Sequence, residues 1–209
     1  SITRPVERPI EQRVLDEAHQ RFLRYGSRSV TMDELAAHLG VSKKTIYQHY
    51  PNKPALVQAV VETEIAEQQA VCEQVCADAE NPIDEMFRIH RYINHKLRDM
   101  APGLVFEIRK YYPAAASVLD SHLQDYVAGL VRDNLQRGQA NQLYRADLLI
   151  EVIVRYYLQS ALLPFDMETY PATEFTPSQV HRQLILHFLH GIVSEHGLRL
   201  LHDYKSHLS

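Results

Sequence analysis

Residues 31–50 contain two helix starts separated by a single glycine, and this spacing constrains the fold more than any other part of the sequence. Thr31 and Glu34 form a capping box, in which the hydroxyl accepts an amide proton and the carboxylate reaches back to the cap. Gly40 then interrupts the chain, and Ser42 offers an N-cap to a new helix. The sequence therefore predicts two short helices, over 32–39 and 43–50, joined by a tight turn.

The apolar residues of this segment fall where two steeply crossing helices bury their side chains. Leu35, Leu39, Val41 and Ile46 are apolar, and Ala36 is small where the helices touch. The alternative, a chance helical hairpin, rarely combines these features with a turn glycine. We therefore interpret the segment as a helix-turn-helix whose second helix enters the major groove of DNA.

The remaining sequence also favours helices over strands. Ile10, Val14, Ala18 and Phe22 recur every four residues, and Gly and Pro are sparse, at 7 and 10. Helical patterns bounded by proline, glycine or polar loops cover the following ranges: 10–25, 53–79, 82–99, 102–112, 113–138, 146–163, 177–196 and 198–206. The predicted fold class is all-α.

Residues 31–53, TMDELAAHLGVSKKTIYQHYPNK, resemble the TetR family of transcriptional regulators. The segment contains the elements of the family pattern in order. These are a Thr/Ser cap, a hydrophobic-Ala pair, Gly-Val-Ser, Thr-hydrophobic-Tyr, an aromatic pair and a lysine that opens the fourth helix, followed by Leu56. The departures are Pro54, where the family often has an acid, and Tyr50, where phenylalanine is common. The resemblance spans about residues 10–60 and implies a dimeric DNA-binding protein.

The resemblance also implies which side chains meet the DNA, and their chemistry agrees. Five residues carry hydroxyl or ammonium groups that suit phosphate oxygens: Thr31, Ser42, Thr45, Tyr47 and Lys53. Four residues of the recognition helix are expected to reach base edges: Lys43, Lys44, Gln48 and His49. The alternatives are that Tyr47 packs against the first helix, that Ser42 only caps, and that His49 is partly buried.

The charge distribution supports a polyanion as partner of the N-terminal quarter alone. Residues 1–53 hold nine Lys or Arg against six acids, a net +3, whereas the rest of the chain has a net charge of −7. Arg4 and Arg8 either form a basic arm along the DNA or belong to a solvated tail. We expect residues 1–53 to form the DNA-binding domain and 54–209 a helical effector-binding and dimerisation domain.

Two further expectations concern the second domain. The helices over 146–163 and 177–196 are apolar around most of their circumference, and the resemblance implies that they form a four-helix dimer interface. Aromatic and polar side chains between 82 and 165 suit a pocket for an aromatic or amphipathic molecule. Its expected residues, for each of which ordinary core packing is the alternative, are His90, Asn94, Phe106, Tyr126, Tyr156 and Tyr157.

Several other kinds of site lack support in the sequence, and we expect no catalytic residues, no cofactor and no metal site. There is no phosphate-binding glycine loop, nucleophile elbow or His-Glu metal helix. His187 and His190, with His181, His196 and His202 nearby, leave metal binding as an open alternative. Cys72 and Cys76 are interpreted as buried hydrophobic residues, and oxidation sensing is the alternative. No apolar run is long enough to span a membrane. Two cysteines four residues apart provide no disulfide framework, so we expect a reducing, cytoplasmic setting.

The predicted function is transcriptional repression, with release from the operator when a small-molecule effector of unknown identity binds. By resemblance, the effector enters between the central helices, displaces the fourth helix and changes the separation of the recognition helices. One alternative is a constitutive or architectural DNA-binding protein without an effector. Another is a helical small-molecule-binding protein or enzyme in which the N-terminal motif is only structural.

Overall fold

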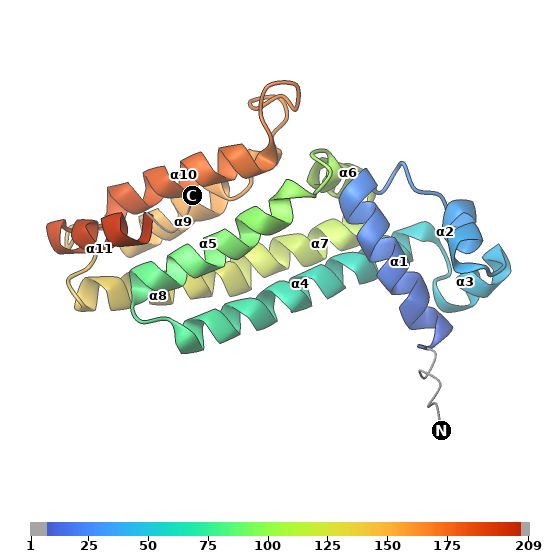
Figure 1. Ribbon diagram of the computed structural model, residues 1–209, viewed down its shortest axis with the longest axis horizontal. Helices are drawn as coiled ribbons and strands as arrows, with labels where there is room; N and C mark the ends of the chain where they lie inside the picture. The colour runs from blue at the N-terminus through green and yellow to red at the C-terminus, as the bar shows by residue number, and fades with distance from the viewer. Residues whose placement is uncertain (1–7, 206–209) are drawn as a thin grey trace.

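The computed structural model describes residues 8–205, which fold into an elongated set of helices with α1–α3 at one end (Figure 1). The all-α prediction is confirmed, because the described part of the chain has no β-strand and a single isolated bridge between Tyr144 and Val193. Arg4, proposed as part of a basic arm, lies outside the described residues. No helix within 8–205 has the length and apolar character needed to cross a membrane.

The N-terminal helices are α1 (Ile10–Tyr25), α2 (Met32–Leu39) and α3 (Lys43–His49). The central elements are α4 (Lys53–Asp78), α5 (Pro82–Arg98), α6 (Leu104–Tyr111), α7 (Pro113–Ser121), the π-helical segment η1 (His122–Val127) and α8 (Ala128–Ala140). The C-terminal elements are α9 (Ile150–Ser160), the 3-10 turn η2 (Leu163–Phe165), α10 (Pro177–Ile192) and α11 (Glu195–Lys205).

Prolines and polar caps place the starts of the long helices. Proline occupies the first turn of α4, α5, α7 and α10, where its missing amide proton has no helical partner to lose. Asn52 and Asn81 accept hydrogen bonds from the first amides of α4 and α5. Thr176 forms a capping box with Gln179 at the start of α10. These caps make the helix starts readable from local sequence.

Two apolar clusters hold the molecule together, one toward each end. The first joins the N-terminal helices to α4, α6 and α7, with Phe22, Leu35, Ile46 and Leu56 at most 1% exposed. The second joins α5 to α8–α11, for example through Ile83, Leu135, Leu189 and Leu201. Because the first cluster crosses from the helix-turn-helix into α6 and α7, the N-terminal helices are packed firmly onto the helices that follow.

Three predicted helices differ from the structure. The helix expected over 113–138 is interrupted by η1, where the backbone makes a π-helical turn. The helix expected over 146–163 begins only at Ile150, and the one expected over 177–196 ends at Ile192. Both differences arise where the chain near Tyr144 pairs with the chain near Val193: Arg145 N donates to Ile192 O and Ser194 N donates to Leu143 O, each at 2.9 Å.

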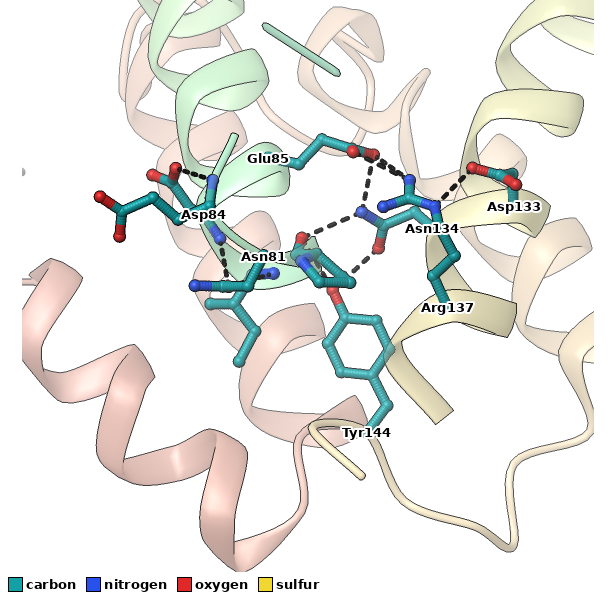
Figure 2. A network of polar contacts seen from close by, with 10 residues as sticks. Asn81, Asp84, Glu85, Asp133, Asn134, Arg137 and Tyr144 are labelled. Carbon is teal, nitrogen blue, oxygen red and sulfur yellow. Dashed lines mark hydrogen bonds and ion pairs between the residues drawn. The ribbon is translucent and has the colours of Figure 1, made fainter. Parts of the chain in front are cut away.

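A buried polar network fixes the start of α5 against α8 (Figure 2). The Glu85 carboxylate, 1% exposed, accepts hydrogen bonds from Asn134 Nδ2 at 2.8 Å and from Arg137 at 2.8 and 2.9 Å. The Tyr144 hydroxyl lies 2.8 Å from Asn134 Oδ1 and 3.1 Å from the Pro82 carbonyl. The network thus joins α5, α8 and the turn after α8 in one set of satisfied polar groups.

Candidate nucleic-acid interface and internal cavity

The third helix turns one face to the core and the other to solvent. Ile46 is fully buried and Tyr50, directly after the helix, is 8% exposed. Lys44, Tyr47 and Gln48 stand on the outer face, where residues three and four apart are neighbours, and Tyr47 is 39% exposed. A basic, hydrogen-bonding outer face on a short protruding helix has the chemistry needed to read a DNA groove.

The local geometry of the helix-turn-helix agrees with the sequence prediction. The Thr31 capping box is present, with Glu34 N donating to Thr31 Oγ1 and Thr31 N donating to the Glu34 carboxylate. Gly40 adopts a φ of 66°, a left-handed conformation that L-residues with side chains rarely adopt. Ser42 caps α3 by accepting a hydrogen bond from Thr45 N at 3.1 Å. The turn therefore depends on the residues that predicted it.

Some of the predicted DNA contacts already have partners within the chain. Lys43 Nζ lies 3.0 Å from Asp33 Oδ2 on the surface. Lys53, half-buried, donates to the Val30 carbonyl at 2.6 Å and lies over the ring of Phe22. Lys53 therefore braces the chain before α2, a role that the sequence did not indicate. Thr45 and His49 are half-buried, whereas Thr31 and Ser42 are exposed.

Behind the N-terminal helices lies an internal cavity of about 220 Å³. Most of the lining side chains are apolar, and they come from the following elements: α1, α4, α5, α6, α7, η1, α9, η2 and α10. Of the residues predicted for a pocket, His90 and Tyr157 line it. The lining excludes Asn94, Phe106, Tyr126 and Tyr156; Asn94 stands behind His181, and Phe106 and Tyr156 are about half exposed.

Among the polar residues of the cavity wall that were not predicted for a pocket are the charged pair Glu64 and Lys96 and two histidines, His122 and His181. His181 was considered only as part of a histidine-rich C-terminal segment. Its contact with His90 joins residues 91 positions apart, which no local pattern indicates. His122 comes directly after α7 and lies three positions after Leu119, another wall residue, so helical spacing from Leu119 was the signal that could have indicated it.

Two histidines, an asparagine and a tyrosine form a continuous hydrogen-bonded relay beside the cavity. His181 Nε2 lies 3.0 Å from His90 Nδ1, and His90 Nε2 lies 2.9 Å from the Tyr157 hydroxyl. At the other end, Asn94 Nδ2 lies 3.3 Å from His181 Nδ1. The relay connects α5, α9 and α10, and it ends at the cavity wall.

The charged groups of the cavity wall neutralise one another. Lys96 Nζ lies 3.0 Å from Glu64 Oε1, and His19 Nε2 lies 2.6 Å from Glu64 Oε2. Burial alone would raise the pKa of Glu64, but hydrogen bonds from His19 and Lys96 outweigh it and lower that pKa. The cluster connects α1, α4 and α5, so it links the helix-turn-helix to the cavity.

The structure also bears on the metal and redox alternatives. Among the described residues, one group has three potential ligands close enough to share an ion: His19, Glu64 and Glu67. The Lys96 ammonium already lies 3.0 Å from Glu64 and 3.5 Å from Glu67, so it supplies the positive charge there. Burial raises the pKa of Cys72 and of Cys76 to about 11, which keeps both thiols protonated and unreactive near neutral pH.

A second cavity, of about 270 Å³, lies between α5 and α10. His90, His181 and Ile185 belong to the walls of both cavities. The second cavity is lined in addition by exposed basic side chains: Arg91, His95, Arg98 and Arg182. The histidine relay therefore lies between a mainly apolar cavity and a basic one.

Lowering the pH from 7 to 5 is expected to destabilise the protein through the relay. Burial holds the pKa of His90 well below its ordinary value and lowers the pKa of His181 to about 4. The unfolded chain binds these protons below about pH 6.5, whereas the folded chain does not, so the contribution is complete above that pH and decreases as the pH falls. For His181 alone the free energy of unfolding decreases by about 2 kcal/mol at pH 5.

Urea unfolding between pH 5 and 7 measures this effect before most carboxylates titrate. The variant His181→Gln should show a shallower pH dependence than the wild type. The matched variant His187→Gln changes an exposed histidine of the same helix and should keep the wild-type slope. Equal slopes for all three proteins would show that His181 is not held neutral.

An exposed basic helix after a left-handed glycine turn, on an all-α body with an internal cavity, defines a helix-turn-helix DNA-binding regulator. Residues 14–60 match the profile of bacterial regulatory proteins of the tetR family. The uncharacterized HTH-type transcriptional regulator YvaF of Bacillus subtilis strain 168 is 26% identical over 190 residues, which cover 89% of this chain and 97% of YvaF. Residues 14–60 are therefore similar to the DNA-binding part of tetR-family proteins, and the chain is a helix-turn-helix transcriptional regulator.

Solved structures of this family share the fold. A TetR-family regulator from Agrobacterium tumefaciens has a TM-score of 0.73 at 15% identity, over 88% of this chain and 97% of that one. A transcriptional regulator from Saccharomonospora viridis in complex with choline has a TM-score of 0.71 at 16% identity, over 89% and 98% of the two chains. Regulators of the family bind operator DNA and form dimers.

Proposed function

We propose that this chain is a dimeric repressor that leaves its operator when a small molecule occupies the internal cavity. The observation that carries the proposal is the shared wall: residues of α1 and α4, which hold the helix-turn-helix, also line the cavity. The similar Saccharomonospora viridis regulator, in complex with choline, supports a small molecule as the occupant. The chain acts by binding in this proposal, with no catalytic step, in the compartment that holds the operator, the cytoplasm.

The outer face of α3 is proposed to read the bases. Lys44 and Gln48 are exposed there and carry the groups that pair with guanine and adenine edges in the major groove. Tyr47, Thr31 and Ser42, which are exposed, are proposed to meet phosphates with their hydroxyls. Lys43 is proposed to exchange its surface contact with Asp33 for DNA, an inexpensive exchange because exposed ion pairs contribute little.

An exposed apolar face of α9 and α10 is proposed to form the dimer interface. Leu149, Val152 and Tyr156 are 72%, 57% and 50% exposed and emerge from the same side at the start and middle of α9. On α10, Gly191 is exposed, and a Cβ there would meet nothing within 4 Å, which permits close approach of a second helix. Two copies would place their recognition helices in adjacent half-sites.

Three contacts are proposed to transmit cavity occupancy to the recognition helices. The Glu64 cluster ties α1 to α4 and α5, and Glu64 lies on the cavity wall. Ser27, also on the wall, donates to Glu107 of α6 at 2.7 Å, and Ala101 N donates to Leu23 O at 2.7 Å. A ligand that displaces α4 would shift the Glu64 cluster directly, and the other two contacts through α1. By linkage, DNA must then weaken ligand binding by the same factor.

The variant Lys44→Ala tests the DNA interface, with a duplex that the wild-type protein selects from a random library. Loss of one base contact in each half-site is expected to weaken binding about ten-fold or more. Binding of the wild type should weaken steeply with salt, measured by fluorescence anisotropy. Lys110→Ala, an exposed lysine on α6, is the control and should bind normally. Selection of no duplex, or equal affinity of both variants, would contradict the proposal.

A further inference from the structure

The direction of the histidine relay is fixed at its far end by a backbone carbonyl. Asn94 Nδ2 lies 2.8 Å from the Ser178 carbonyl, which only accepts, so this atom of the side chain is the amide nitrogen. The Ser178 hydroxyl lies 3.1 Å from Asn94 Oδ1 and donates to it, which agrees with the same orientation. The amide therefore also donates to His181 Nδ1, at 3.3 Å.

Each following step then has one possible direction. Because Nδ1 of His181 accepts, the neutral ring carries its proton on Nε2 and donates it to His90 Nδ1 at 3.0 Å. His90 in turn donates from Nε2 to the Tyr157 oxygen at 2.9 Å. A further proton on either ring would face a donor, so the geometry requires two neutral imidazoles. Burial lowers the pKa of both histidines, which agrees.

The relay leaves one hydrogen without a partner, and it is at the cavity. Tyr157 accepts from His90, and within residues 8–205 its hydroxyl contacts no other group that would accept its hydrogen. Tyr157 is 7% exposed and lines the cavity, so water of the bulk does not reach this hydroxyl freely. A buried donor without an acceptor is costly, and an acceptor on a bound molecule would remove that cost.

His122 presents a second such group on the same wall. Its ring is 7% exposed, and its Nε2 is a buried side-chain nitrogen without a hydrogen-bond partner in the described part of the chain. Gln69 Nε2 lies 3.2 Å from His122 Nδ1 and donates to it, which places the proton of the neutral ring on Nε2. Tyr126 stacks on the ring at 5.4 Å and holds it in place.

We infer that the cavity takes a neutral, mainly apolar molecule that carries carbonyl-type oxygens, one accepting from Tyr157 and another from His122. This inference rests on the proposed effector function and names its ligand class. A charged ligand would find no unpaired group of opposite charge on this wall, because Lys96 Nζ and Glu64 Oε1 pair with each other at 3.0 Å. Arg91, Arg98 and Arg182, for which residues 8–205 provide no ion pair, line the second cavity, beyond the relay.

Two compounds of matched shape, bibenzyl and deoxybenzoin, test the inference by calorimetry on the full chain. They differ by one carbonyl group, and diphenylacetate and choline serve as charged probes. Deoxybenzoin is expected to bind the wild type about five-fold more tightly than bibenzyl, the contribution of one hydrogen bond. The charged probes should bind more weakly than deoxybenzoin. Tyr157→Phe should weaken the preference for deoxybenzoin. The double variant Tyr157→Phe, His122→Phe should abolish this preference, so that both compounds bind with equal affinity.

The variant Tyr25→Phe is the matched control, because it removes the hydroxyl of a tyrosine that is 50% exposed and lies outside the cavity, so it should keep the wild-type ratio of the two affinities. Equal binding of bibenzyl and deoxybenzoin by the wild type, or a preference for a charged probe, would overturn the inference while leaving the effector function intact. Absence of binding by every probe would overturn it as well. DNA binding, measured separately without ligand, reports whether the proposed operator function itself stands.

Discussion

Replacing Glu85 with alanine is expected to lower the free energy of unfolding by about 2–3 kcal/mol, because it removes a buried carboxylate that accepts three hydrogen bonds from Asn134 and the partly exposed Arg137. The carboxylate accepts from Asn134 and twice from Arg137, and it is 1% exposed. Its removal leaves Asn134 with the Pro82 carbonyl as its remaining acceptor and Arg137 with Asp133 as its remaining partner (Figure 2). The quantity is measured by chemical denaturation followed by circular dichroism.

Two further variants separate the ion pair from other effects. Glu85→Gln keeps an acceptor in place and should lose less than Glu85→Ala. Asp133→Ala removes a carboxylate that contacts the same arginine at 2.7 Å but is 65% exposed, so it should cost well under about 1 kcal/mol. If the exposed and the buried carboxylate cost equal amounts, the buried network does not stabilise this end of the molecule.

Replacing Val152 with glutamate is expected to make the protein monomeric and to weaken operator binding by more than about 100-fold. Val152 is 57% exposed in the single chain, at the centre of the proposed dimer face. A carboxylate there would be buried against its symmetry mate without a partner. A monomer binds one half-site, so it loses the gain of about 10²–10⁴ that two linked contacts provide.

Sedimentation velocity and anisotropy measure the two effects on the same sample. Phe106→Glu is the matched control: Phe106 is 49% exposed on α6, away from α9 and α10, and its variant should stay dimeric. A dimeric Val152→Glu protein would show that the copies associate through another surface. A monomer with unchanged operator affinity would show that one helix-turn-helix suffices.

Local chemistry made the N-terminal motif predictable. The Thr31 cap, the left-handed Gly40 and the buried Ile46 each follow from residues a few positions apart, and the structure has all three. Side-chain contacts between residues far apart in the sequence were less predictable. Lys53 was assigned to phosphate from its charge and position, yet its first contact is the Val30 carbonyl, 23 residues earlier. Charge indicates a possible partner, and packing decides which partner is reached.

The cavity shows the same limit more strongly. Tyr156 and Tyr157 are adjacent in a helix that is apolar on most sides, so periodicity gave no reason to separate them. Only Tyr157 faces inward. The meeting of His90, His181 and Tyr157 depends on the crossing of α5, α9 and α10. Such positions follow from tertiary geometry and not from local sequence.

The hydrogen bonds between α6 and the turn after α1 have a practical consequence for domain exchange. Glu107 accepts hydrogen bonds from Ser27 Oγ and Arg28 N, and Arg28 also donates to the Tyr111 hydroxyl. A chimera that grafts only residues 1–53 onto another body would lose these bonds and expose apolar side chains of the shared cluster. Grafts that carry α4 and α6 together with α1–α3 would keep these contacts and would transfer the DNA specificity with a stable fold.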